Sequence, residues 1–126
     1  VGASVEVKRA IFLDRAKAPH LAYVGDSVLG RDVNLGAGTV LSNFRHDGAE
    51  IAIPADGRKV ATGRRKLGAL LGDGVAVGCN SVLNPGTIVG ARTQVYTGVQ
   101  LRSGAYPADS IVKLRQALEI VRLARG

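Results

Sequence analysis

The chain has 126 residues, a net charge of +7, 4% aromatic residues, no Met or Trp and one cysteine. This length suits one domain, and a single Cys79 excludes an internal disulfide or a cysteine-rich zinc site. The charge favours phosphorylated small ligands over nucleic acid, since aromatic platforms and nucleic-acid-binding motifs are absent from the sequence. No apolar run approaches the roughly 18 residues of a membrane span. Because Val1 replaces an initiator Met, we expect a piece of a longer, cytoplasmic protein without a signal peptide.

The first third of the chain advances in steps of six residues. Successive hexads begin at Val1, Val7, Leu13 and Pro19. The phase shortens to five between Val24 and Leu29, and it returns to six at Leu35 and Leu41. Such a slip indicates a reshaped corner. It follows a segment that contains His20, one of only two histidines.

The repeat is lost from Phe44 to about Lys66. Turn-forming residues are frequent in this stretch, namely Gly48, Pro54, Asp56-Gly57 and Gly63. Its cations are Arg45, Arg58, Lys59, Arg64, Arg65 and Lys66. We expect an insertion between two coils of a repeat structure. The insertion either takes part in function or serves as a solvated basic loop.

The hexads return with full regularity from residue 71 to residue 101. Aliphatic residues occupy every sixth position, at Leu71, Val77, Leu83, Val89, Val95 and Leu101. The fifth position of each hexad is small or β-branched, at Val75, Ser81, Thr87, Thr93 and Val99. A period of six fits neither an α-helix nor a simple alternating strand. It predicts a parallel β-helix in which three hexads make one coil and residues 18 apart stack.

The C-terminal segment changes its period again. Its apolar residues are Ile111, Leu114, Leu118 and Val121, with steps of three and four. This spacing predicts an amphipathic helix that starts near Pro107 and covers the open end of the β-helix. The sequence therefore predicts an all-β domain over residues 1–106, with a loop at about 44–66, followed by a capping helix over 107–126.

Three motifs carry a family resemblance. They are Val5-Glu-Val-Lys8, His20-Leu-Ala-Tyr23-Val-Gly-Asp and Val33-Asn34-Leu-Gly-Ala37-Gly-Thr, followed by Asn43-Phe44. Together they resemble the C-terminal acetyltransferase domain of the bifunctional N-acetylglucosamine-1-phosphate uridyltransferases. The resemblance implies a left-handed β-helix and a homotrimer with active sites between subunits. The later stretch from Thr62 to Thr87 resembles nucleotidyltransferase-like relatives that carry such a β-helix.

The resemblance also implies a reaction, in which an acetyl group moves from acetyl-coenzyme A to the amine of glucosamine-1-phosphate without a metal. His20 matches the general base, a role that suits an imidazole with an ordinary pKa near about 6.5. Lys8 matches a phosphate ligand, Tyr23 and Asn34 match sugar contacts, and Asn43 matches a residue that orients base and substrate. The N–H of Ala37 is expected near the thioester carbonyl, and coenzyme A near Cys79 and Thr97.

The sequence departs from the family at three points. Phe44 replaces a tyrosine, Cys79 replaces a serine, and a family lysine after Asn43 has no clear counterpart, so that Arg45, Arg58 or Lys59 are candidates for its role. One alternative is a non-catalytic β-helix that serves as a trimerising or regulatory tail of a sugar nucleotidyltransferase. A β-helix carbonic anhydrase is disfavoured because it needs three histidines, and only His20 and His46 exist.

Overall fold

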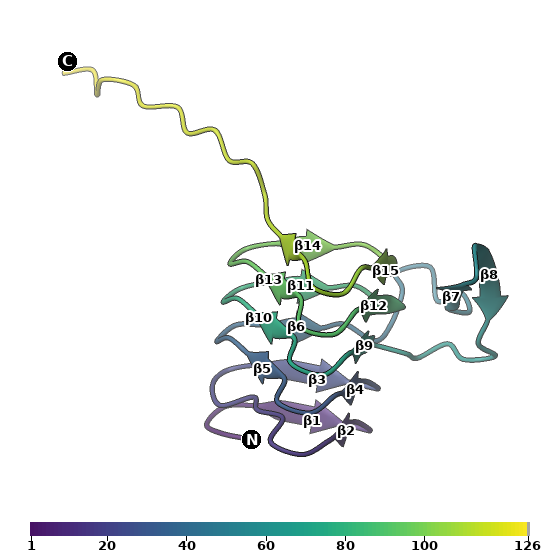
Figure 1. Cartoon of the computed structure of the whole chain (residues 1–126). Coiled ribbons are helices and arrows are strands. Elements are labelled where there is room, and N and C mark those ends of the chain that lie inside the picture. The colour runs from purple at the N-terminus through teal and green to yellow at the C-terminus, as the bar shows by residue number, and fades with distance from the viewer. Residues whose placement is uncertain (126) are drawn as a thin grey trace.

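The computed structural model describes residues 1–125. Apart from the insertion and the segment after residue 112, they wind as a parallel β-helix with three faces (Figure 1). The first sheet contains β1 (Glu6–Lys8), β3 (Tyr23–Gly25), β6 (Val40–Leu41), β11 (Val82–Leu83) and β14 (Gln100–Leu101). The second contains β5 (Asn34–Leu35), β10 (Ala76–Val77), β13 (Gln94–Val95) and β16 (Ile111–Val112). The third contains β2 (Ile11–Phe12), β4 (Val28–Leu29), β9 (Ala69–Leu71), β12 (Thr87–Val89) and β15 (Gly104–Tyr106). The predicted parallel β-helix is confirmed, and its left-handed sense stays a prediction.

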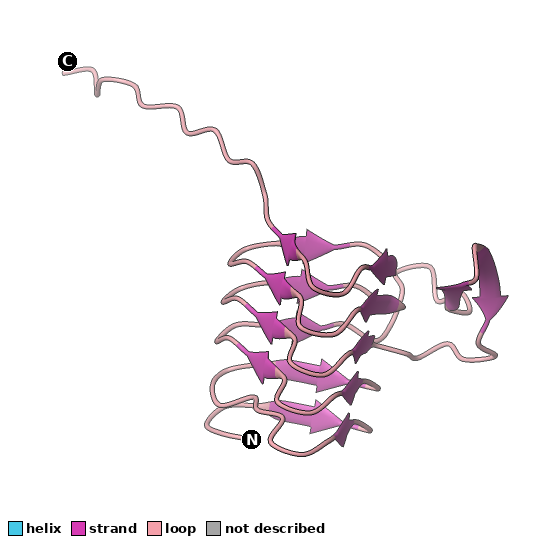
Figure 2. Ribbon diagram, in the orientation of Figure 1, coloured by secondary structure: helices cyan, strands magenta, loops and turns pink. Residues whose placement is uncertain are grey.

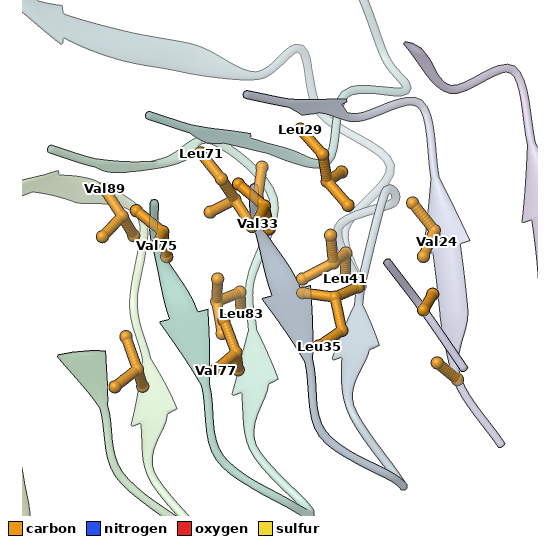
Figure 3. Close-up of a cluster of buried hydrophobic side chains, with 14 of the residues drawn as sticks. Val24, Leu29, Val33, Leu35, Leu41, Leu71, Val75, Val77, Leu83 and Val89 are labelled. Carbon is orange, nitrogen blue, oxygen red and sulfur yellow. The ribbon is translucent and has the colours of Figure 1, made fainter. Parts of the chain in front are cut away.

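Aliphatic side chains at the hexad positions fill the interior (Figure 3). Leu71 pairs with Val89, and Leu83 with Leu101, so residues 18 apart stack as the period predicts. Each buried aliphatic side chain contributes about 1.5–3 kcal/mol relative to exposure. The fifth hexad positions are also buried, and the hydroxyls among them bond to backbone carbonyls at the corners: Thr87 to Asn84 and Thr93 to Pro107, both at 2.6 Å. The narrow coil thus accepts small polar groups only where the backbone satisfies them.

The first coil differs from the predicted phase. Phe12 aligns with Leu29, 17 positions on, and packs against the core, while Ala18 is fully buried. Leu13 is 44% exposed, so the inward positions are Phe12 and Ala18 rather than Leu13 and Pro19. This coil is one residue short because the inward positions Val7 and Phe12 are five residues apart rather than six. The second coil repeats this irregularity, since Val24 and Leu29 are also five residues apart.

The insertion folds as an antiparallel hairpin of β7 (Ala52–Ala55) and β8 (Arg58–Ala61), which projects from one corner (Figure 1). An antiparallel bridge between Phe44 and Lys66 closes its base. Ile51 is 1% exposed, and a side chain added to Gly86 would meet it, so Ile51 anchors the insertion on the next coil. The insertion thus leaves the β-helix between two coils and has regular structure of its own.

The predicted C-terminal helix is wrong. Ile111 and Val112 form β16, which pairs with β13, and residues 113–125 continue as an extended segment (Figure 2). Leu114 and Leu118 are 63% and 77% exposed, so the apolar stripe has no partner surface among residues 1–125. Because β16 takes up Ile111 and Val112, a helix could span only residues 113–125, a length that is marginal without packing. None of residues 1–125 belongs to a helix that could span a membrane.

Candidate functional site

A column of backbone groups runs along the corner between the second and first sheets. The carbonyl of Ala37 accepts from Asn80 N at 2.9 Å, and the carbonyl of Cys79 accepts from Gly98 N at 2.9 Å. These bonds stack Ala37, Cys79 and Thr97 on successive coils. The three residues predicted to bind the cofactor therefore share one exposed edge, although up to 60 positions separate them in sequence. We call this edge the corner column.

The corner column depends on glycines that precede its members. A Cβ on Gly36 would lie 2.7 Å from Cys79 N, and one on Gly78 would collide with Thr97 N. Glycine at both places lets adjacent coils approach closely. Within residues 1–125, the N–H groups of Ala37, Cys79 and Thr97 have no hydrogen-bond acceptor. The corner column thus presents a row of unpaired N–H donors to a ligand with carbonyl groups.

His20 lies at the lower end of the corner column. The next residue, Leu21, adopts a left-handed backbone with φ 35°, and its carbonyl accepts from Gly38 N at 2.6 Å. This bond sets the His20 corner directly against the Ala37 corner. The His20 side chain is exposed, so it is accessible to a ligand along the column.

Three further predicted residues converge on Gly25 at the edge of the first sheet. Strand register places Lys8 beside Gly25. A Cβ on Gly25 would lie 2.7 Å from the Tyr23 hydroxyl and 2.6 Å from Asn43 Nδ2. The missing side chain therefore makes room for the Tyr23 phenol and the Asn43 amide to meet. Lys8, Tyr23 and Asn43 form what we call the acceptor group.

Asn34 does not join the acceptor group. It belongs to β5 of the second sheet, where it is exposed and aligns with Lys17 and Ala76. Tyr23 begins β3 on the first sheet, so the corner that carries His20 separates the two sugar-contact candidates. Of the two sugar-contact candidates, Tyr23 is the one that lies with Asn43.

Asp26 is a site residue that the sequence analysis missed. Its side chain is 1% exposed, and its Oδ2 accepts from Asn43 Nδ2 at 2.6 Å. Its backbone has φ 45°; its N–H donates to the Lys8 carbonyl, and its carbonyl accepts from the Gly68 N–H. These bonds fix the carboxylate beneath the acceptor group. The sequence offered one sign of it, an aspartate after Val24-Gly25 in the resembling motif. That sign was ambiguous because aspartate is also common at left-handed turn positions.

The insertion contributes a cationic pocket beside the acceptor group. Arg9, Phe44, Gly63, Arg64, Arg65 and Lys66 line this hollow of about 650 Å³. The candidates Arg45, Arg58 and Lys59 are not among them. Arg45 forms a bidentate ion pair with Asp47, at 2.9 and 2.6 Å, and Arg58 and Lys59 lie in β8. The positive charge that lines this pocket thus comes from Arg9 and from the segment Arg64–Lys66.

The arrangement defines a hexapeptide-repeat parallel β-helix with an exposed donor column and an adjoining polar group. The chain is homologous to the C-terminal region of bifunctional GlmU and sugar-1-phosphate nucleotidylyltransferase/acetyltransferase proteins. One relative is the "Bifunctional sugar-1-phosphate nucleotidylyltransferase/acetyltransferase" of Sulfurisphaera tokodaii, 47% identical over 78% of this chain and 24% of that protein. Another is the "Bifunctional protein GlmU" of Methanococcus vannielii, 37% identical over 89% of this chain and 28% of that protein.

The chain therefore spans about a quarter of the length of these curated relatives. No protein-family model matches it. Among solved structures, native serine acetyltransferase 1 from Entamoeba histolytica aligns with a TM-score of 0.61, over 88% of this chain and 39% of that one. Their sequence identity is 14%, so this likeness concerns the fold alone.

Proposed function

We propose that this chain is an acetyl-coenzyme A-dependent acetyltransferase unit that acetylates the amine of an amino sugar phosphate. The proposal rests on the closeness of the corner column to the acceptor group. The corner column of free N–H groups ends at His20, and Tyr23 of the acceptor group begins three residues later. The 47% identical relative, whose name includes sugar-1-phosphate and acetyltransferase activities, supports the same reaction class.

The corner column suits coenzyme A because the pantetheine arm is long and carries amide carbonyls. The donors at Cys79 and Thr97 would hold that arm, and the donor at Ala37 would meet the thioester carbonyl. A hydrogen bond to the developing oxyanion is worth roughly 3 kcal/mol in well-formed sites. Asn34, exposed on the second sheet, would contact a sugar held between this face and a neighbouring subunit.

The chemistry requires a base because a protonated amine cannot attack a thioester. His20 would accept a proton from the acceptor nitrogen as that nitrogen bonds to the acetyl carbon. The carbon–sulfur bond then breaks, and the coenzyme A thiolate leaves and takes up the proton. Transfer is direct in this scheme, so the Cys79 thiol forms no bond to the acetyl group.

The acceptor phosphate would lie between Lys8 and the cationic pocket. Lys8 supplies a point charge at the first sheet, and Arg64 and Arg65 supply forked donors from the insertion. Both the acceptor group and the corner column include exposed residues, namely Lys8, Cys79 and Thr97, which agrees with a homotrimer whose subunits close each site. Sedimentation that shows only monomer at micromolar concentration would contradict the trimer.

The deciding experiment measures thiol release from acetyl-coenzyme A with glucosamine-1-phosphate as acceptor. The parent protein, His20→Gln and a matched control, His46→Gln, are compared. Loss of the general base should lower kcat by about 10²–10⁴-fold. His46 lies in the insertion, away from the corner column, and its variant should keep the parent rate. Equal rates for His20→Gln and the parent would overturn the proposal.

A second candidate function is a non-catalytic trimerising or regulatory tail. It is favoured by the replacement of the family tyrosine by Phe44. A parent protein that trimerises but binds no coenzyme A by calorimetry would establish this reading instead.

A further inference from the structure

A buried carboxylate lies directly under the acceptor group. Asp26 Oδ2 accepts the hydrogen bond from Asn43, while Oδ1 is buried with no hydrogen-bond partner in residues 1–125. A buried acceptor without a partner lowers the stability of the fold, so such atoms commonly mark a functional constraint. The nearest cation is the guanidinium of Arg64, whose terminal nitrogen lies 3.8 Å from Oδ1.

The carboxylate decides how the Asn43 amide is oriented. An ionised carboxylate only accepts hydrogen bonds, so the amide must turn its NH₂ group toward Asp26. The planar amide then directs its carbonyl oxygen away from Asp26. That oxygen receives no hydrogen bond from any group in residues 1–125. Asn43 therefore presents a free acceptor beside the Tyr23 hydroxyl.

The second oxygen of Asp26 links the site to the insertion. Arg64 follows the hairpin, and its side chain is 56% exposed, whereas the Asp26 side chain is 1% exposed. The guanidinium thus covers the carboxylate from the solvent side. This contact sets where the cationic pocket lies relative to Asn43.

We infer that Asp26 is a positioning residue for the acceptor, acting through Asn43 and Arg64. Through Asn43 it presents a carbonyl oxygen that accepts an N–H of the acceptor amine and aims the nitrogen lone pair at the acetyl carbon. Through Arg64 it holds the cationic pocket at a fixed distance for the acceptor phosphate. The inference rests on the acetyltransferase function proposed above.

The first test is Asp26→Asn, which keeps the shape but adds a donor. The new amide can donate to Asn43, which would then turn its own NH₂ group toward the acceptor. We expect kcat to fall about 100-fold, as when one transition-state hydrogen bond is lost. The KM for acetyl-coenzyme A should stay within twofold, because the corner column is untouched. A kcat equal to that of the parent would overturn the positioning role.

The reciprocal swap supplies the control for folding. In the double variant Asp26→Asn/Asn43→Asp, the buried amide donates to the new carboxylate, which again presents an oxygen outward. We expect kcat at least tenfold above that of Asp26→Asn alone. A purely structural role predicts no such recovery, so a double variant no faster than the single would also overturn the inference.

Arg64 is tested by its own matched pair. Arg64→Ala should raise the KM for glucosamine-1-phosphate about tenfold with kcat within threefold, and Arg58→Ala, in β8, should change neither. Equal KM values for the two variants would refute the link through Arg64. A parent protein without thiol release would instead refute the acetyltransferase function itself, which keeps the two failures distinct.

Discussion

Leu29 pairs with Leu71 across neighbouring coils, although 42 positions separate them and the regular coils repeat after 18. The core column is therefore continuous through the point where the insertion leaves. Removing Phe44–Leu67 would join Asn43 to Gly68 and bring Leu41 and Leu71 back to six positions apart. The insertion is an addition to the β-helix rather than a part of its core.

We predict that a variant lacking residues 44–67 folds with the parent circular dichroism spectrum. It should still bind coenzyme A, since the corner column lies on another corner. The KM for glucosamine-1-phosphate should rise more than tenfold, because Arg64, Arg65 and Lys66 are gone. Calorimetry with coenzyme A and initial rates with the acceptor check both halves. An unfolded variant would show that the anchor at Ile51 is needed for folding.

The sequence predicted the β-helix because the residues that recur at every sixth position are the residues that form the core. Every aliphatic hexad position from Leu71 to Leu101 is buried, since each coil must place one such residue on each face. The first coil was misphased because Phe12 and Leu13 are both apolar, and periodicity does not distinguish adjacent candidates. The C-terminal stripe from Ile111 to Val121 has the spacing of an amphipathic helix, but spacing alone does not tell whether a surface exists for the apolar face to pack against.

The candidate site was predictable only where a residue matched a motif. Lys8, Tyr23 and Asn43, which the resemblance singles out one by one, lie together in the structure, and Ala37, Cys79 and Thr97 share one edge. Asp26 was missed because its role depends on burial and on a contact with Asn43, 17 positions away. The sequence does not predict which cationic residues of the insertion lie near Asn43, because the hairpin register decides which of them face the β-helix.

Gly78 is predicted to be intolerant of even a methyl group. A Cβ there would collide with the backbone nitrogen of Thr97, which cannot move without shifting a whole coil. Gly78→Ala should lower the free energy of unfolding by about 3 kcal/mol, the upper range for overpacking. Gly63→Ala is the control: it has φ 69° and open space, so it should lose only about 1 kcal/mol from backbone strain. Denaturant titration of both variants measures the difference.

The Arg45–Asp47 pair in the insertion predicts a pH effect. Hydrogen bonds from the Arg45 guanidinium, and then from Ala49 N–H, lower the pKa of Asp47 to about 2. Since the folded pKa lies below the unfolded one, the stabilisation is present above the ordinary aspartate pKa and disappears as pH falls through about 2. Arg45→Gln should move the Asp47 midpoint upward in an NMR titration of the side-chain carboxyl. Arg58→Gln should leave that midpoint in place, and a shift in both variants would assign the effect to net charge.

Cys79 provides a reporter for the corner column that does not depend on catalysis. Its thiol is exposed and forms no disulfide, and its N–H belongs to the column. Saturating coenzyme A should slow alkylation of Cys79 by iodoacetamide at least tenfold, because the bound arm would cover the thiol. Glucosamine-1-phosphate alone should leave the rate unchanged, since the acceptor group lies on the first sheet and Cys79 does not belong to it. Mass spectrometry of the alkylated chain gives both rates. Equal labelling with and without coenzyme A would show that coenzyme A does not bind along the corner column.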